Sequence, residues 1–314
     1  MALITVLMPV YNGIRYLPEA VGAIKAQTTK DWKLLVVDDG SSDGSREYVE
    51  NLNDPNIELL ALPHVGLGAA LNAGLERCRS PFIARMDCDD TCHPTRLERQ
   101  LQFLQTKPEI GMVGTQFRYF GAGGEVPSSR QLPLDHDLIV SELFSGRLAL
   151  VHASLMFRAT AIHSIGGYRV KGVGEDWDLF LRICEKTRAA NLAETLYQWR
   201  LHPTSVCREH TREAARRIRY ACDCARRRQQ GMEEISFEEY RTIENALPLW
   251  LRTTRRFDEY ALGQYREAIE ELADGKQLRG RLRLGWSGCC SPRRGVIRVL
   301  RKFRASHSGD PSVT

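Results

Sequence analysis

Residues 83–90, IARMDCDD, pass from a short apolar run directly into three aspartates within four positions. A run of this length and composition is typical of a buried strand. Asp87 and Asp89 are two positions apart, so on an extended strand end their side chains share a face. Carboxylates this close raise each other's pKa unless a cation lies between them. The stretch therefore predicts a buried strand that ends in a dense acidic cluster, in which Asp90 is explained equally well as a local cap.

The residues on either side of this stretch alternate short apolar runs with amphipathic segments. The runs predict four strands, at residues 3–10, 32–37, 57–62 and 82–86. Helical spacing follows each of them, at residues 16–27, 45–52, 68–78 and 94–106. This order predicts an α/β fold with a Rossmann-like, mostly parallel central sheet flanked by helices.

After the glycine-rich turn at residues 121–124 the alternation loosens. We expect a mixed sheet there, with a helix at residues 135–144, a strand at 153–157 and a helix at 176–186. Beyond Cys207 the chain becomes basic and helical in pattern, with segments at residues 237–246 and 260–273.

Composition and charge limit the partners and the cellular compartment that we expect for this protein. The 314 residues include 44 Lys and Arg against 39 Asp and Glu, and the net charge of +5 is too small to indicate nucleic acid as a partner. The nine cysteines are irregularly spaced, which is typical of free thiols in a reducing compartment, so we expect a cytoplasmic protein. No basic leader with a cleavage site is present, and no apolar stretch approaches the roughly 20 residues of a membrane span.

Polar motifs follow three of the predicted strands, where an open α/β sheet binds its ligands. They are PVYNG at residues 9–13, DDGSSD at 38–43 and DCDD at 87–90. Each motif alone is explained as a turn or a helix cap. Together, two acidic strand ends call for a cation, and Mg²⁺ or Mn²⁺ arriving with a diphosphate fits oxygen ligands. Neither a dinucleotide-binding glycine motif nor a phosphate loop is present to hold phosphate in another way.

GLGAALNAGL, at residues 66–75, is a fourth motif. The four motifs and their order resemble those of the inverting family 2 glycosyltransferases of the GT-A fold, and the resemblance covers residues 4–205. The resemblance implies transfer of a sugar, with inversion, from a nucleotide-sugar donor, a UDP-sugar first, to a hydroxyl of a glycan or lipid-linked saccharide, as in surface polysaccharide synthesis. It implies Mn²⁺ or Mg²⁺ as cofactor. Residues 1–119 become the nucleotide-sugar-binding half, 120–205 the acceptor and catalytic half, and 206–314 a helical basic region.

The resemblance also assigns donor-binding residues. Pro9 and Tyr11, with Asn12 beside them, are expected to line the base and ribose pocket, and Asp39 to hydrogen-bond the base. Asp87 is expected to contact the ribose and the metal-bound diphosphate.

Asp89 is the first choice as metal ligand, with Asp87 as the second ligand. Leu71 stands where many relatives carry Arg, which weakens the case for a cationic contact to the diphosphate from that helix.

A second acidic cluster opens the helix expected at residues 176–186. Acids at a helix N-terminus are favoured by the helix dipole, and this explains Asp178 without invoking function. An inverting transfer needs one carboxylate to deprotonate the acceptor hydroxyl. The resemblance assigns this role to Asp176, with Glu175 positioning the acceptor.

Further along, Arg200 and His202 are candidate contacts to the diphosphate, and His152 is a weaker candidate for the acceptor site.

Two alternative functions stay open. A sugar nucleotidyltransferase also presents carboxylates to a metal on an α/β sheet, and a non-catalytic sugar-nucleotide-binding protein would keep the same fold.

The basic tail has three interpretations. It is first a solvated Arg-rich helix face, and second a helix on an anionic membrane through residues 296–304, which would place the protein at the inner face of the membrane. Nucleic-acid binding comes third, because the sequence has no recognition motif for it.

Overall fold

The chain divides into two compact units. The computed structural model describes residues 2–126, 131–169, 174–202 and 211–291. The first unit comprises Met1–Phe120, Pro127–Arg200 and Arg216–Glu234, and the second comprises Gly121–Val126, Leu201–Ala215 and Ile235–Thr314. The functional boundaries expected at residues 119 and 205 stay predictions.

Four strands of the first unit form a parallel sheet, as the apolar runs predict. They are β1 (Ile4–Val10), β2 (Trp32–Asp38), β3 (Ile57–Ala61) and β4 (Phe82–Arg85). Their spatial order is β3-β2-β1-β4, and β1 pairs with β2 over the full length of both strands. Parallel strands that are covered on both faces are apolar at nearly every position, and all seven residues of β1 are buried.

Beyond β4 the sheet is mixed, which confirms the expectation from the later sequence. β8 (Met156–Arg158) lies antiparallel between β4 and β6 (Ile110–Gly121), and β6 runs parallel to β9 (Arg188–Arg200). The two-residue strand β5 (Thr91–Cys92) pairs antiparallel with β9. The strand expected at residues 153–157 begins later, because η1 (His152–Ser154), a turn of 3₁₀ helix, occupies its first residues. Neither β6 nor β9 has a counterpart among the predicted strands.

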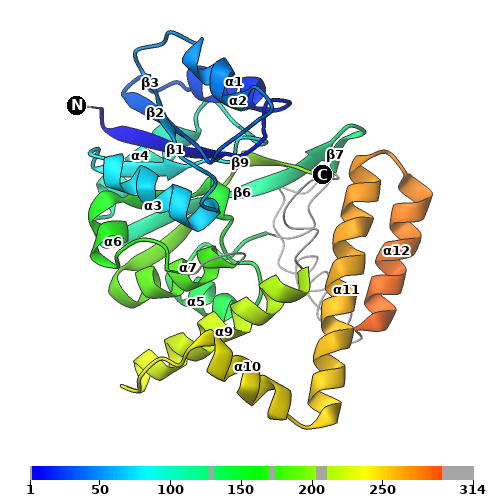
Figure 1. Cartoon of the computed structure of the whole chain (residues 1–314). Coiled ribbons are helices and arrows are strands. Elements are labelled where there is room, and N and C mark those ends of the chain that lie inside the picture. Colours follow the sequence, from blue (N-terminus) through cyan, green and yellow to red (C-terminus); the bar gives the residue numbers. More distant parts are fainter. Residues whose placement is uncertain (1, 127–130, 170–173, 203–210, 292–314) are drawn as a thin grey trace, which may run out of the picture. The chain divides into compact units, whose positions relative to one another are not determined.

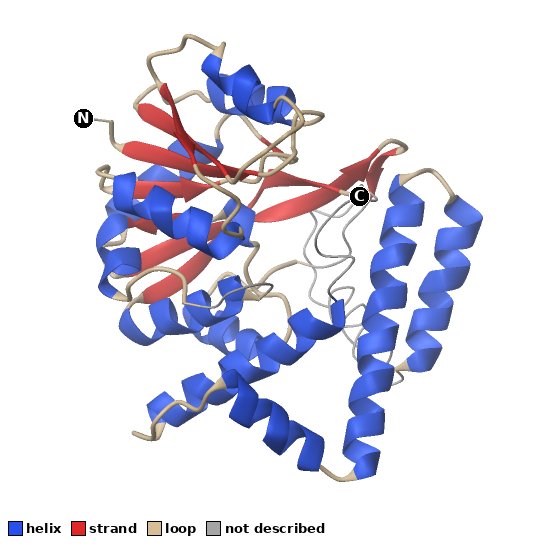
Figure 2. Ribbon diagram, in the orientation of Figure 1, coloured by secondary structure: helices blue, strands red, loops and turns tan. Residues whose placement is uncertain are grey.

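Helices cover both faces of this sheet (Figures 1 and 2), and each face has its own hydrophobic core. One core receives α1 (Leu17–Lys25), α2 (Ser45–Glu50) and α4 (Arg96–Thr106). The other receives α3 (Leu67–Arg77), α5 (His136–Phe144), α6 (Ala159–Ser164), α7 (Glu175–Lys186) and part of α9 (Thr211–Gln229). Successive side chains of a strand point to opposite faces, so Val6 and Met8 enter the first core and Leu7 the second.

The second unit is helical where it is described, apart from the short strand β7 (Gly124–Val126). It contains α10 (Phe237–Ala246), α11 (Leu249–Ala273) and α12 (Gln277–Cys290). α11 begins earlier than the expected helix at residues 260–273, and α12 packs against it closely enough that a Cβ on Gly280 would lie 2.9 Å from the Ala268 carbonyl oxygen. The basic segment 296–304 lies outside the described residues. None of the helices in the described ranges has both the length and the hydrophobicity needed to cross a membrane.

Alanine substitutions of two glycines, one in α3 and one in α1, test how closely these helices pack on the sheet. A Cβ on Gly74 of α3 would collide with Leu7 of β1 and lie 2.9 Å from Cγ2 of Val37, whereas a Cβ on Gly22 of α1 would meet nothing within 4 Å. Gly74→Ala should lower the free energy of unfolding, because overpacking costs about 1 to 3 kcal/mol. Gly22→Ala should raise it by up to about 1 kcal/mol through helix propensity alone.

Urea denaturation of the two variants beside the native chain measures both effects. A Gly74→Ala variant as stable as Gly22→Ala would show that α3 does not pack on β1 and β2 as described.

Candidate active site

The candidate site lies at the carboxyl edge of the sheet, where the strand order reverses between β1 and β4. In open α/β sheets this reversal opens a crevice that binds ligands. The loops after β1, β2 and β4 end at this edge, and they carry the three polar motifs predicted from the sequence.

The loop after β1 is held to the loop after β2 by hydrogen bonds. Asn12 donates its backbone N–H to Ser41 Oγ at 2.9 Å, and its side-chain oxygen accepts the N–H of Ser42 at 2.8 Å. The Ile14 N–H donates to Asp43 at 2.9 Å. Burial raises the pKa of Asp43, but hydrogen bonds from Ser45 and from backbone N–H groups outweigh this effect and hold the pKa below its ordinary value. The amide of Asn12 therefore joins two loops, and its contact with a donor stays a prediction.

The residues expected to line the base pocket differ in how far they are exposed to solvent. Pro9 is buried within β1, whereas the ring of Tyr11 is 51% exposed. The Asp39 side chain is only 5% exposed, and its carboxylate accepts the N–H groups of Val65 at 2.7 Å and Gly66 at 3.0 Å. The contacts of Pro9, Tyr11 and Asp39 with a nucleotide stay predictions.

The aspartates after β4 form one cluster. One carboxylate oxygen from each of Asp87, Asp89 and Asp90 lies within 4.8 Å of the others, and hard oxygen donors of this kind suit Mg²⁺ or Mn²⁺. Asp90 is buried and accepts hydrogen bonds from the Tyr197 hydroxyl at 2.6 Å and the Arg200 N–H at 2.7 Å. Asp90 thus links the loop to β9, and the roles of Asp89 and Asp87 as metal ligands stay predictions. Burial, with Asp89 and Asp87, raises the pKa of Asp90.

Arg85, the last residue of β4, is a member of the site that the sequence analysis missed. Its side chain is buried, pairs with the carboxylate of Asp87, and has an Nε without a hydrogen-bond partner among the described residues. Burial lowers the pKa of Arg85, but the nearby Asp87 raises it by more. The pKa therefore lies above its ordinary value, and the guanidinium stays charged. The sequence signal that could have identified Arg85 as the partner of Asp87 was the presence of a charged residue inside an apolar strand.

Arg200 supports the aspartate loop from β9. Its Nε donates to the Asp89 carbonyl oxygen at 2.7 Å, its guanidinium pairs with Glu19, and it lies over the rings of Tyr16 and Phe120. Its predicted contact with the diphosphate stays a prediction.

His202 is half-buried and belongs to the second unit, so its predicted contact with the diphosphate stays a prediction too.

The acidic cluster predicted as catalytic forms the N-terminus of α7. Gly174 precedes it in the left-handed region, with φ +87°, which glycine adopts without strain. Glu175 is 6% exposed, and burial together with the neighbouring Asp176 raises the pKa of Glu175 to about 8. Asp176 is half-buried and accepts the Trp177 N–H at 2.8 Å. The two acids therefore have different environments.

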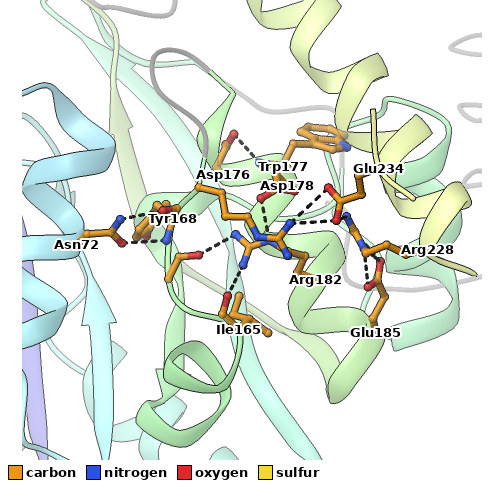
Figure 3. Close-up of polar contacts among 12 residues, drawn as sticks. Asn72, Ile165, Tyr168, Asp176, Trp177, Asp178, Arg182, Glu185, Arg228 and Glu234 are labelled. Carbon is orange, nitrogen blue, oxygen red and sulfur yellow. Dashed lines mark hydrogen bonds and ion pairs between the residues drawn. The ribbon is translucent and has the colours of Figure 1, made fainter. Parts of the chain in front are cut away.

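A loop between α6 and α7 is held from two sides (Figure 3). Arg182, which pairs with Asp178 at 2.7 Å, donates to the carbonyl oxygens of Ile165 and Gly167, both at 2.7 Å. From α3, Asn72 exchanges two hydrogen bonds with the backbone of Tyr168, at 2.8 and 2.9 Å. These contacts fix the backbone that leads to Tyr168.

The Tyr168 hydroxyl in turn lies 2.6 Å from Nε2 of His152, and the pKa of His152 is lowered by burial of its ring and by Arg85.

The β4 loop and the N-terminus of α7 lie close enough for their charges to interact. Asp87 raises the pKa of Glu175, whereas Arg85 lowers it, and both also act on Tyr168. The predicted metal loop and the predicted catalytic pair therefore lie within electrostatic range of each other, and the charge of Arg85 acts on Glu175 as well as on its partner Asp87.

The raised pKa of Glu175 makes the stability of the metal-free protein depend on pH. The carboxyl has an ordinary pKa of 4.5 and a pKa of about 8 in the folded chain, so the folded state holds a proton that the unfolded state releases between these values. Stability is therefore lost as pH rises from 4.5 through about 8. Glu175→Gln removes this loss, so its melting temperature should exceed that of the native chain by more at pH 9 than at pH 5. Parallel melting curves across this range would contradict the assigned environment.

Comparisons with known proteins identify the family of this chain. Residues 5–166 match the model of the family described as glycosyl transferase family 2. The chain is 31% identical over 212 residues to the O-antigen biosynthesis glycosyltransferase WbnJ of Escherichia coli, which covers 65% of this chain and 82% of that protein.

Two solved structures share the fold. Residues 1–349 of S. aureus TarS in complex with UDP-GlcNAc superpose with a TM-score of 0.61 at 14% identity, covering 89% of this chain and 87% of that one. The mannosyltransferase PcManGT of Pyrobaculum calidifontis, in complex with GDP-Man and Mn²⁺, superposes with a TM-score of 0.53 at 15% identity, covering 91% and 87%. The chain therefore belongs to glycosyl transferase family 2 and is a glycosyltransferase of the GT-A fold.

Proposed function

We propose that this glycosyltransferase moves a sugar from a nucleotide-sugar donor, a UDP-sugar first, to a hydroxyl of a glycan or lipid-linked saccharide, with inversion, in the synthesis of a surface polysaccharide. The observation that carries the proposal is the convergence of the three carboxylates after β4, with oxygens within 4.8 Å of one another, at the edge of the sheet where the strand order reverses. The name of WbnJ refers to O-antigen synthesis, and the structures of TarS and PcManGT contain UDP- and GDP-sugars, which supports this class of donor and product.

In this proposal Asp89, with Asp87 beside it, holds Mn²⁺ or Mg²⁺. The bound cation supplies neutralisation of the charge that develops on the departing diphosphate. Convergence of the three aspartates supports the assignment, as does the Mn²⁺ in the PcManGT complex. Arg85 orients Asp87 through its ion pair, and Arg200 and Tyr197 hold the loop from β9.

Asp176 is the proposed base. It is the more accessible acid of the pair and can accept the proton of the acceptor hydroxyl as that oxygen attacks the anomeric carbon. Glu175, with a pKa of about 8, keeps its proton at neutral pH and can donate a hydrogen bond to the acceptor. Two neighbouring carboxyls with different exposure can thus divide positioning from proton abstraction.

The other elements receive proposals of smaller scope. Residues 1–205 would form the catalytic domain, with donor binding in 1–119 and acceptor binding in 120–205, and residues 206–314 would form a helical basic region. Contact with an anionic membrane through residues 296–304 is proposed from their sequence alone, because they lie outside the described residues. The nucleotidyltransferase alternative would release pyrophosphate from a nucleoside triphosphate, whereas the proposed enzyme releases nucleoside diphosphate from UDP-, GDP- or dTDP-sugars.

Asp176→Asn tests the base. It should lower the turnover number at least 10²-fold, because general base catalysis contributes about 10² to 10⁴ in rate, and it should leave UDP binding within about twofold. Asp137→Asn is a matched control, since Asp137 is also a first-turn aspartate of a helix, α5, and is exposed. Nucleotide release with a donor found by screening measures turnover. Normal transfer by Asp176→Asn would exclude Asp176 as base.

Asp89→Asn tests the metal site. The substitution removes a charged oxygen ligand, so Mn²⁺-dependent binding of UDP should weaken at least tenfold, while binding without metal should change little. Calorimetric titration of the protein with UDP, once in the presence of Mn²⁺ and once in the presence of EDTA, measures the metal-dependent and the metal-independent binding separately. Asp90→Asn should instead lower the melting temperature, because Asp90 holds Tyr197 and Arg200. Unchanged Mn²⁺ dependence in Asp89→Asn would overturn the assignment of Asp89.

A further inference from the structure

The side chain of His64 fills the space beside Tyr11 at the carboxyl edge of the sheet. The two rings are stacked, with centroids 4.2 Å apart and planes inclined by 22°. Nδ1 of His64 lies 3.0 Å from the carboxylate of Asp39 and 3.1 Å from its backbone carbonyl oxygen. Because a carbonyl oxygen only accepts, Nδ1 is the nitrogen that carries the hydrogen. His64 therefore presents a flat ring to Tyr11 and a ring N–H to Asp39.

A nucleobase offers the same two features. Uracil and guanine are flat rings. In a nucleotide each keeps one ring N–H, at N3 of uracil and at N1 of guanine, which can donate a hydrogen bond to a carboxylate. An exposed aromatic ring and a nearly buried carboxylate at the ends of adjacent parallel strands suit such a ligand, because stacking accepts any flat ring and the carboxylate accepts its N–H. At a centroid separation of 4.2 Å, no third ring fits between Tyr11 and His64. A base that stacks on this face of Tyr11 must therefore displace the imidazole.

The backbone around His64 can stay in place while its side chain leaves. Asp39 holds the loop through the N–H groups of Val65 and Gly66, and a carboxylate has about four acceptor positions, so loss of the His64 contact leaves the loop attached. The backbone of His64 also lies against Gly40, where a Cβ would come within 2.8 Å of the His64 nitrogen. The His64 side chain itself is 58% exposed, which leaves it room to rotate towards solvent.

We propose that His64 is a built-in competitor of the donor nucleobase: its ring occupies the base site of the donor-free chain and is displaced when the nucleotide binds. This inference rests on the proposed function and adds a determinant of donor affinity. A site filled by its own side chain in roughly nine of ten molecules binds a ligand about tenfold more weakly than the same site when open.

Calorimetric titration of the full chain with UDP and with GDP, each with Mn²⁺, tests the proposal. His64→Ala should bind at least one of the two nucleotides about 3- to 10-fold more tightly than the native chain. His64→Phe should gain less, because it keeps a ring that can stack on Tyr11 but has no nitrogen for Asp39. His163→Ala, an exposed histidine at the end of α6, is the matched control and should bind as the native chain does.

A second measurement does not depend on any variant. In the native chain, ring protons of His64 should be shifted upfield by the ring of Tyr11, and saturating nucleotide should move them back towards the positions of an exposed histidine. Equal or weaker nucleotide binding by folded His64→Ala, or histidine signals that do not move when nucleotide binds, would overturn the competitor role alone. Failure of UDP and GDP to bind the native chain and all variants would overturn the proposed donor, and the competitor role with it.

Discussion

The concentration of carboxylates at one edge of the sheet is the constraint on which the site depends. Four of these acids are accommodated in different ways: Asp87 by the buried guanidinium of Arg85, Asp90 by the Tyr197 hydroxyl and a backbone N–H, Asp39 by two backbone N–H groups, and Glu175 by a raised pKa. Moving a charged group out of water costs free energy unless protein groups replace its hydrogen bonds to water. The contacts of the loop after β4 with β9 therefore serve the acids as well as the packing.

The first half of the fold could be predicted because β1, β2 and β4 are buried along almost their whole length. β1 and β2 are continuous apolar runs, and the pattern leaves few other structures for them. β6 and β9 are 12 and 13 residues long, contain polar residues, with glycines in β6, and pair through several register shifts, so no regular period marks them. The two residues of β5 are a strand only because β9 lies beside them.

For the site, the sequence predicted positions but not partners. Acids at strand ends and at a helix start are local patterns, and the structure brings three of them, Asp87, Asp89 and Asp90, within 4.8 Å of one another, although their roles stay predictions. The partners lie far away in the chain: Tyr197 contacts Asp90 across 107 residues, and Asn72 contacts Tyr168 across 96. Nothing near Asp39 indicates that His64 would lie against it, because that contact depends on the backbone path of the loop after β3.

Arg200 stands at a boundary of the chain as well as in the site. It is the last residue of a segment of the first unit, and the chain passes into the second unit at Leu201. The N–H of Arg200 holds Asp90, and its guanidinium holds the backbone of Asp89. The first unit therefore ends this segment on a residue that is tied to the aspartate loop, so that a single residue serves both the end of β9 and the shape of the loop.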